Sequence, residues 1–366
     1  MARRGIDPAG LARLRAATQL LHRPVSAGDP AEIARSIAGA QAQDVYAGPL
    51  TFRSRSRKLN AEDIRRARTE ERSLLRTWVM RMTIHMIPTQ DAGWWLPLFE
   101  PGIEAWSRRR LAQLGMSAAK QDKALRVAAR VLEQEGPLTR SEVREFIEAA
   151  GVSLNSQTGM HVALTAVVSG IACLGPDRGK TTCLVRREDW IGRPPPFDRE
   201  PALAELARRY LAAFSPATDR DYAYWSGLPL RDVRAGLESI SSEIEEVRVG
   251  EEVMHSLRGG IPRLPRTGQV RLLGNFDTYL LGWKDRSFSV AGEHALHVKE
   301  GGGGWIRPVI LEDGIVIGGW RSARKGGRLE ISLNLPKRER ERLRPKLDAE
   351  IADLERFEAT EIEVVA

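Results

Sequence analysis

The feature that most constrains the fold of this chain is an order of sequence patterns, helical first and then a short β pattern, that occurs three times. In the first occurrence, Asp7-Pro8 and Asp29-Pro30 each pair a helix-capping residue with a proline, which predicts two helix starts, and a third helix is expected from Asn60. From Arg76 to Ile87 apolar and polar residues alternate, which predicts a strand or a strand pair with one apolar and one polar face. Helices followed by such a β element are typical of a winged-helix module.

The same order returns twice along the chain. Helices are expected at 118–135, from 139 onward and at 155–169, followed by a hairpin built from 171–174 and 182–185. After a stiff linker at 193–196, three more helices are expected at 202–214, 218–227 and 230–241, with a short β element at 244–253. The simplest account is a tandem array of three winged helices.

From about residue 268 the sequence favours strands. They are expected at 270–273, 309–311, 314–320, 329–335 and 361–365, with a flexible loop at 301–304 and a helix at 337–357. We therefore predict an α+β protein of three tandem winged-helix modules followed by a β-rich part, a small antiparallel barrel or sandwich. The expected domains are 1–115, which holds the candidate catalytic segment, 116–196, 197–265 and 266–366.

Charge is unevenly distributed along the chain. The net charge is +8, and residues 1–90 alone contain 16 Lys and Arg against 8 Asp and Glu. Residues 320–346 contain 10 Lys and Arg against 3 Asp and Glu. Two basic regions are expected of a protein that contacts a phosphate backbone, although solvated helix faces would give the same counts.

The composition also bears on compartment and partners. No run of about 18 apolar residues is long enough to span a bilayer, the first residues lack the apolar core of a signal peptide, and the two cysteines do not make a disulfide scaffold. We expect a cytoplasmic protein, associated with the nucleoid, with no membrane partner. Nothing in the sequence suggests an obligate dimer, so a monomer is expected.

Four segments, taken together and in order, resemble the winged-helix DNA-binding family that includes AlkZ and its relatives. They are residues 38–43 (AGAQAQ), 76–85 (RTWVMRMTIH), 277–286 (DTYLLGWKDR) and 308–320 (PVILEDGIVIGGW). The chain departs from the family pattern in two places. Met82 stands where glycine is usual, and Gly274-Asn275 stands where Pro-Ala is commoner.

The resemblance implies a C-shaped arrangement of three winged helices with a β-rich C-terminal part, and a monofunctional DNA glycosylase. Such enzymes hydrolyse the bond between deoxyribose and an alkylated base, and some unhook interstrand crosslinks. Their catalytic signature is glutamine, an apolar residue, then glutamine or aspartate, which Gln41-Ala42-Gln43 matches. The implied partner is double-stranded DNA carrying alkylated purines, and no cofactor or metal is implied.

The chemistry of Gln41 and Gln43 suits such a substrate. An amide does not titrate, so it is no general base, but it can orient a water and direct a carbonyl dipole at developing positive charge. A purine alkylated at N7 or N3 already carries positive charge and leaves without protonation. On a helix the two side chains would point about 200° apart, so they converge only if the helix ends or the backbone becomes extended. The alternative is that both glutamines cap the helix end.

Four further residues are candidates for DNA contact. On the polar face of the first β segment, Arg81 is a candidate phosphate or strand contact and His85 a candidate active-site hydrogen-bond partner. Arg178 and Lys180, on the expected second wing, are placed to touch phosphate. The alternatives are a polar face that is merely solvated and a histidine satisfied in the core.

Several other features are given structural or neutral interpretations. Asp277 and the pair Asp285-Arg286 are expected to fix the start of the β-rich part. The segment 175–181 resembles a phosphate-binding loop but has one residue too few between its glycines, and His294 with His297 lacks the ligands of a zinc site. The basic helix at 337–346 is expected either along DNA or in solvent.

Two other functions compete with the glycosylase. A non-enzymatic transcription regulator would use the same winged helices and bind with sequence selectivity. A scaffold for RNA or protein would interact with DNA in a salt-insensitive way. A glycosylase instead prefers damage to sequence, because a base is exposed at least cost at a weakened site.

Overall fold

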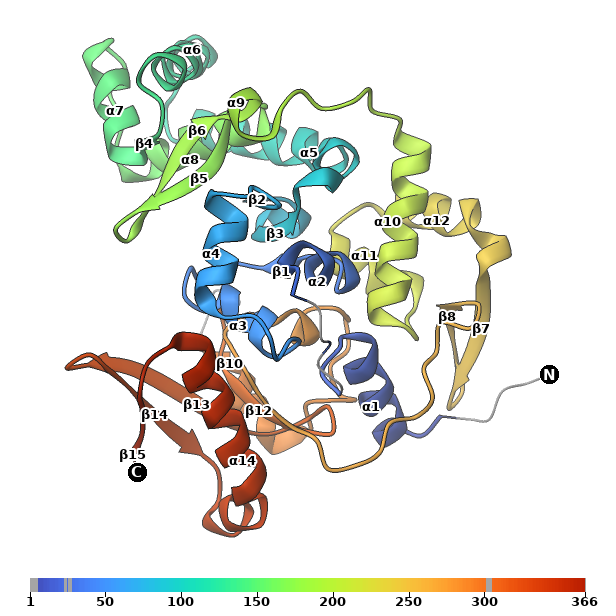
Figure 1. Ribbon diagram of the computed structural model, residues 1–366. Helices are drawn as coiled ribbons and strands as arrows, with labels where there is room; N and C mark the ends of the chain where they lie inside the picture. The colour runs from blue at the N-terminus through green and yellow to red at the C-terminus, as the bar shows by residue number, and fades with distance from the viewer. Residues whose placement is uncertain (1–5, 23–24, 26–27, 301–304, 366) are drawn as a thin grey trace. The chain divides into compact units, whose positions relative to one another are not determined.

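The computed structural model describes residues 6–22, 25, 28–300 and 305–365, and it contains two compact units (Figure 1). One unit consists of residues 65–202, and the other combines residues 1–64 with residues 203–366. Helices α4 (Ala61–Thr69) and α10 (Arg199–Phe214) contain the points where the chain passes from one unit to the other. The loop expected at 301–304 lies outside the described residues.

The 65–202 unit is a sheet with helices, and its strands lie in the order β3-β2-β5-β6-β4. The strands are β2 (Leu74–Trp78), β3 (Ile84–Pro88), β4 (Leu138–Thr139), β5 (Ala172–Arg178) and β6 (Thr181–Arg186). The helices are α5 (Ala92–Gln113), α6 (Ala118–Glu135), α7 (Arg140–Ala149), α8 (Ser156–Val168) and α9 (Arg187–Ile191). The predicted helices and the second hairpin are confirmed, whereas α5 was not predicted.

Local capping explains where the helices of this unit begin. Thr139 accepts from the Glu142 amide while the Glu142 side chain accepts from Thr139, a complete capping box at the start of α7. Asn155 and Thr158 form the equivalent pair at the start of α8. Because nine of the 13 residues of α8 are buried, its apolar residues surround the whole helix rather than one face.

The first hairpin corrects the prediction of one polar face. The alternating segment is a strand pair, β2 with β3, joined by a 3₁₀ turn at Met80–Met82. Arg81 and Met82 have φ of 54° and 59°, so Arg81 lies in the turn and not on a strand face, and Met82 is 41% exposed. The apparent alternation fails because a left-handed turn interrupts the two-residue period of a strand.

The other unit begins with short elements at the N-terminal end of the chain. Asp7 and Asp29 cap α1 (Pro8–Thr18) and α2 (Pro30–Ser36) through hydrogen bonds from Gly10 N and Ala31 N, as predicted. After α2 come the two-residue strand β1 (Ala40–Gln41) and the helix α3 (Gly48–Arg53). Neither was expected, since both are too short to show a period.

A second set of helices and a hairpin follows α10. It consists of α11 (Asp219–Ser226), α12 (Leu230–Ser239), β7 (Ile244–Val249) and β8 (Glu252–Leu257), with β7 and β8 antiparallel. A bridge between Ala217 and His255 adds one more antiparallel contact. The core of this part is a group of stacked and tilted rings: Tyr210, Phe214, Tyr222, Trp225 and Trp283.

The C-terminal part is a five-stranded sheet in the order β15-β14-β13-β12-β9. Its elements are β9 (Val270–Leu273), β12 (Val309–Glu312), β13 (Ile315–Lys325), β14 (Arg328–Asn334), β15 (Ile362–Val365) and the long helix α14 (Lys337–Glu358). The short elements α13 (Ala295–Val298), β10 (Lys299–Glu300) and β11 (Trp305–Ile306) precede β12.

This sheet corrects the expectation of a small antiparallel barrel. Over the described residues β9 and β15 are its two edges, and β15 runs parallel to β14, so the sheet is open and mixed. Helix α14 lies against the sheet (Figure 1) and buries Leu343, Leu347 and Leu354 against its apolar side chains. Because α14 covers the apolar face of the sheet, that face is buried without closure of the strands into a barrel.

The cysteines and the helices can also be compared with what the composition indicated. Cys173 and Cys183 are both free and buried, and burial raises the pKa of the Cys173 thiol to about 12. Among the described residues, no helix is long and apolar enough to cross a membrane.

Candidate active site

The backbone around Gln41 and Gln43 meets the geometric condition set by the sequence. Helix α2 ends at Ser36, and the left-handed residues Ala38 (φ 55°) and Gly39 (φ 84°) turn the chain out of the helix. Gln41 then lies in β1 and Gln43 in the bend that follows. Because the helix ends before the motif, the separation of about 200° that a helix would impose on the two side chains does not apply. Since α2 ends five residues before Gln41, neither glutamine stands at a cap position.

The two glutamines differ in their exposure. Gln41 is buried, with 5% of its surface accessible, whereas Gln43 is exposed. A buried amide is held in one orientation because its polar atoms need partners within the protein. Gln41 is therefore the better fixed of the two dipoles, and Gln43 is the one that solvent reaches.

Asp44, which the sequence analysis did not single out, shapes the turn after Gln43. Its carboxylate Oδ1 accepts hydrogen bonds from the backbone N of Tyr46 (2.8 Å) and of Ala47 (3.1 Å). Its carbonyl accepts from Gly48 N at 3.0 Å, at the start of α3. An Asp whose side chain bonds the amide two residues on is a recognised turn former, and this signal was present in the sequence.

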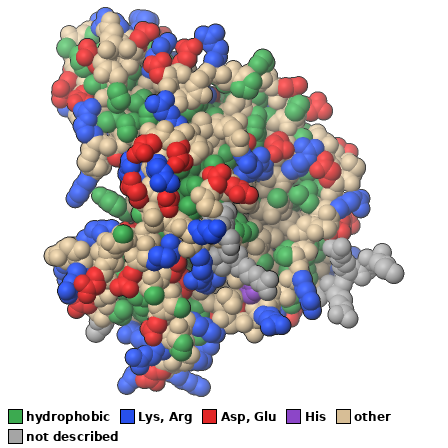
Figure 2. Space-filling view, in the orientation of Figure 1, with side chains coloured by type: hydrophobic (Ala, Val, Ile, Leu, Met, Phe, Trp, Pro, Cys, Tyr) green, Lys and Arg blue, Asp and Glu red, His purple; other side chains and the backbone are tan. Residues whose placement is uncertain are grey.

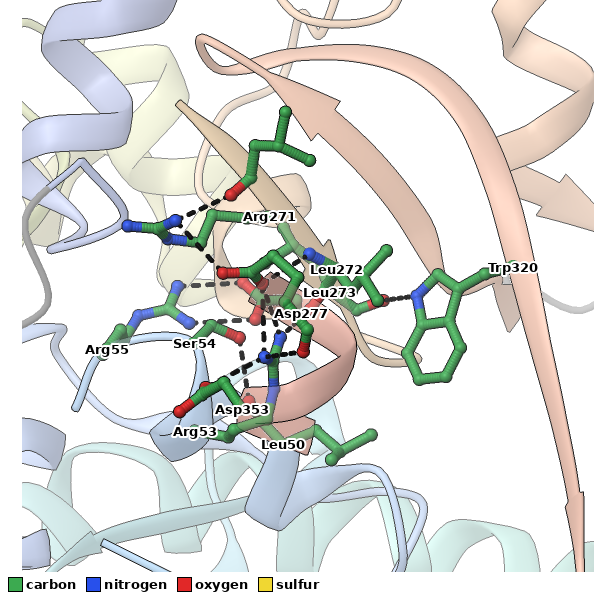
Figure 3. Close-up of polar contacts among 12 residues, drawn as sticks. Leu50, Arg53, Ser54, Arg55, Arg271, Leu272, Leu273, Asp277, Trp320 and Asp353 are labelled. Carbon is green, nitrogen blue, oxygen red and sulfur yellow. Dashed lines mark hydrogen bonds and ion pairs between the residues drawn. The ribbon is translucent and has the colours of Figure 1, made fainter. Parts of the chain in front are cut away.

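A cluster of buried charges lies where α3 meets β9 and α14 (Figure 3). Arg53 donates to Glu350 (3.2 Å) and Asp353 (3.1 Å), and Arg271 donates to Glu350 at 3.1 Å. Arg55 holds both carboxylate oxygens of Asp277 at 2.9 Å, and neither side chain is exposed. We call Arg53, Arg55, Arg271, Asp277, Glu350 and Asp353 the charged cluster.

The charged cluster assigns a structural role to part of the third recognisable segment. Asp277 fixes the start of the β-rich part, as predicted, by pairing with Arg55. Further along, Asp285 accepts from Ser287, and Arg286 donates to the Tyr224 hydroxyl at 2.9 Å. Tyr279 donates to Gly314 O at 2.7 Å and Trp283 to Phe214 O at 3.0 Å, so the segment is largely part of the core.

His85, in the 65–202 unit, is a buried neutral side chain. Its Nδ1 lies 3.2 Å from the Thr83 carbonyl, which defines it as the donor nitrogen. Burial first, and then the charge of Arg81, lowers the pKa of His85 to about 3. This environment favours the interpretation of a histidine satisfied in the core, and a contact of His85 or Arg81 with substrate stays a prediction.

The segment expected to form the second wing is the antiparallel hairpin of β5 and β6, with Gly179 (φ 63°) in its turn. The loop-like segment 175–181 therefore belongs to a hairpin and opens no helix, as expected. Lys180 is exposed at the tip. Arg178 donates to Glu142 (2.7 Å) and to Pro137 O (2.8 Å), so a phosphate would have to compete with these partners. DNA contact by either residue stays a prediction.

The basic C-terminal region is more neutral than its sequence suggests. Ion pairs join Arg324 to Glu358, Lys325 to Glu330, Arg328 to Glu361 and Arg342 to Glu312 and Glu339. The face drawn in Figure 2 likewise carries Lys and Arg interspersed with Asp and Glu. These pairs favour the solvated interpretation for much of this charge.

His294 lies in the 3₁₀ turn Gly292–His294 that precedes α13, and His297 lies in α13. The rings of His294 and His297 are stacked with centroids 5.8 Å apart. Among the described residues, no group of three or more His, Cys, Asp or Glu side chains is arranged to hold a metal ion.

Residues 34–357 match the profile of the family described as DNA glycosylase AlkZ-like, a span that includes all four recognisable segments. An interstrand DNA cross-link repair glycosylase of Streptomyces sahachiroi is 28% identical over 308 residues, covering 79% of this chain and 81% of that protein. The solved structure of the Streptomyces sahachiroi DNA glycosylase AlkZ superposes with a TM-score of 0.79 at 23% identity, covering 99% of this chain and 100% of the other. The last similarity establishes a shared fold.

Proposed function

The chain belongs to the AlkZ-like DNA glycosylase family, and from this premise we propose that it hydrolyses the N-glycosidic bond of purines alkylated at N7 or N3 in double-stranded DNA. Membership of this family identifies the protein as a DNA glycosylase rather than a non-enzymatic transcription regulator. The observation that carries the substrate proposal is that the helix ends before Gln41, which lies in β1, and Gln43, which lies in the bend after it, two amides with no titratable group between them.

The proposed reaction divides the work between the two amides. The bond between C1′ and N9 breaks with its electron pair going to the purine, which leaves as a neutral base because it already carried positive charge. The Gln41 carbonyl dipole, fixed by burial, stabilises the positive charge that develops on the sugar. The exposed Gln43 orients the water that adds to C1′, and the proton lost from that water passes to solvent.

This division explains why amides suffice. A leaving group that needs no protonation removes the requirement for a general acid, and a water adding to an oxocarbenium-like carbon needs orientation more than deprotonation. An unalkylated purine would have to be protonated first. The proposal therefore includes selectivity for charged, alkylated purines over normal ones.

The finer architecture is also part of the proposal. We interpret 116–196 and 197–265 as winged-helix modules, since each has three helices followed by an antiparallel hairpin, and 1–115 as a more divergent first module. The enzyme works as a monomer on the genome, in the cytoplasm at the nucleoid. Because the Streptomyces sahachiroi relative is named for interstrand cross-link repair, crosslinked purines are proposed as a second substrate.

The test is release of free base from a duplex with a single N7-alkylguanine. Wild type should release the base, and the double variant Gln41→Ala, Gln43→Ala should release none while still binding the duplex. The matched control is the double variant Gln113→Ala, Gln157→Ala, which removes two exposed amides from the 65–202 unit. Equal release by wild type and the Gln41, Gln43 variant would exclude the assigned residues, and no release by wild type from this duplex or a crosslinked one would exclude the substrate class.

A further inference from the structure

Residues 274–278, the segment between β9 and the 3₁₀ turn at Thr278–Leu280, contact the chain on both sides of the glutamines. Thr278 Oγ1 donates to the carbonyl of Gly39 at 3.4 Å, two residues before Gln41. Asn275 Nδ2 donates to Asp44 Oδ2 at 3.3 Å, directly after Gln43. These two contacts join residues that are 231 and 239 positions apart in the sequence, and they bracket the four residues 40–43.

The contact with Asp44 acts on a carboxylate that already organises the turn. With Oδ1 bonded to the amides of Tyr46 and Ala47, the Asn275 amide occupies the remaining oxygen, Oδ2. The carboxylate is thereby held in one rotamer from two directions. A carboxylate held by three donors fixes the backbone that bears it, and that backbone continues directly into Gln43.

The 274–278 segment is itself firmly anchored. Asp277 is paired with Arg55 of the charged cluster, and it also accepts from Tyr279 N at 3.0 Å. At Gly274 an added Cβ would lie 3.1 Å from Leu50 Cβ and 3.3 Å from the Ala47 carbonyl, so the absence of a side chain permits the close approach. The departure from the family pattern at Gly274-Asn275 therefore has a structural account: glycine brings the segment close, and asparagine supplies the amide.

We propose that Asn275 is a positioning residue that sets the place of Gln43 through Asp44, with Thr278 holding the Gly39 side of the same loop. The inference rests on the proposed function of Gln43. The reason is the place of the contact: Asp44 directly follows Gln43, so a contact that fixes the turn at Asp44 also fixes the backbone that carries Gln43. A displacement of about 1 Å at a reacting group is enough to lower a rate by about a hundredfold.

The test exchanges the two side chains of the contact. Asn275→Asp puts two carboxylates side by side and should lower kcat for base release at least about tenfold, with KM changed less than about twofold. The exchanged pair Asp44→Asn, Asn275→Asp restores an amide facing a carboxylate, and its kcat should return to within about threefold of wild type. When the pH is lowered from 8 to 5, the Asn275→Asp variant should regain activity, because two adjacent carboxyls share a proton at lower pH. Wild type and the exchanged pair should show no such gain.

A second measurement follows the loop without relying on catalysis. Hydrogen exchange of the backbone amides in peptides covering 39–48 should accelerate in Asn275→Asp and return to the wild-type rate in the exchanged pair. Asn155→Asp is the matched control, since aspartate caps α8 as well as asparagine does, and it should change neither kcat nor this exchange.

The outcomes separate the positioning role from the proposed function. If wild type releases no base, the reaction is wrong, and the exchange rates still decide whether Asn275 holds the loop. If Asn275→Asp keeps wild-type kcat and wild-type exchange, or if the exchanged pair recovers neither, the positioning role is overturned. A loss of kcat in Thr278→Val that Thr278→Ser does not show is expected for the contact with Gly39.

Discussion

Each of the two units contains a buried polar cluster that stabilises it, and the two clusters differ in their chemistry. The charged cluster joins α3 to β9, to α14 and to Asp277 through pairs separated by 79 to 300 residues. In the 65–202 unit, Ser107, His161 and Thr165 form a neutral cluster between α5 and α8, with partners 54 and 58 residues apart. The two clusters differ in what the loss of one partner costs. Loss of one partner of an ion pair leaves a buried charge without its counter-ion, whereas loss of one partner of a neutral pair leaves one hydrogen bond unmade.

Residues of the charged cluster are close in sequence to residues that contact the loop carrying Gln41 and Gln43. Arg53 ends α3, which starts at the turn shaped by Asp44, and Asp277 neighbours Thr278, which bonds Gly39. Charged pairs of this kind select which distant segments meet, because any other pairing would bury an unpartnered ion. We infer that the charged cluster fixes the position of the loop that carries Gln41 and Gln43, while the neutral cluster holds α5 and α8 together.

The largest expected effect is the loss of one partner from the charged cluster. Arg55→Met removes the cation that pairs with the buried carboxyl of Asp277, and should lower the free energy of unfolding by about 3–5 kcal/mol. In the double variant Arg55→Met, Asp277→Asn the charge is gone and the acceptor for Tyr279 N is kept, so at least about 1 kcal/mol should return. Urea unfolding measures both; equal losses in the single and double variants would show that the charge is not what matters.

The next effect concerns the pH dependence of stability and a buried neutral side chain of the 65–202 unit, His85. Because the pKa of His85 is lowered to about 3, the unfolded chain binds a proton first as the pH falls below the ordinary histidine value. The stability contributed by neutral His85 is therefore complete above about pH 6.5 and is lost progressively towards pH 3, with about 2 kcal/mol gone at pH 5. On going from pH 8 to pH 5, the unfolding free energy of His85→Gln should therefore change by about 2 kcal/mol more in favour of the folded state than that of wild type.

The comparison with His85→Gln is needed because another group works in the opposite direction. Burial raises the pKa of Glu100 to about 7 despite its contact with Arg187, so the folded state takes up that proton first and gains stability as the pH falls from about 7 to 4.5. The wild-type pH profile alone therefore mixes the two groups. An unchanged profile in His85→Gln would contradict the assignment of a neutral buried His85.

A smaller effect is expected within the neutral cluster. Ser107 is fully buried, with its hydroxyl 3.1 Å from His161 Nδ1 and 2.9 Å from Thr165 Oγ1. Ser107→Ala should cost about 1–2 kcal/mol, because Thr165 keeps its bond to the His161 carbonyl and no charge is exposed. A loss as large as that of Arg55→Met, measured in the same urea series, would remove the distinction between the clusters.

The sequence predicted elements that depend on neighbouring residues and missed contacts that depend on distant ones. Helix 118–135 is found with the predicted bounds, and the capping residues at Asp7, Asp29 and Thr139 mark true helix starts. The short helix α3 and the strand β1 were missed because six and two residues show no period. Arg81 was misplaced because a left-handed turn is invisible to an alternation pattern.

The candidate site divides in the same way. Gln41 and Gln43 came from a motif of three adjacent residues, and in the structure the helix ends before this motif, with Gln41 in β1 and Gln43 in the following bend. Asn275 and Thr278 touch the loop from more than 230 residues away, so no local pattern could pair them with Asp44 and Gly39. The openness of the C-terminal sheet was likewise missed, since it depends on where α14 packs.

The smallest effect is expected where charges pair in solvent, and it limits how far the comparison extends. Arg342, 47% exposed, donates to both carboxylate oxygens of Glu312, a geometry close to that of Arg55 with Asp277. Arg342→Met should nevertheless change the unfolding free energy by less than about 1 kcal/mol, since water solvates the Glu312 carboxylate that is left. Raising the salt concentration should weaken the wild-type pair and leave the contribution of Arg55 almost unchanged. A cost for Arg342→Met near that for Arg55→Met would show that bidentate geometry, rather than burial, gives the charged cluster its weight.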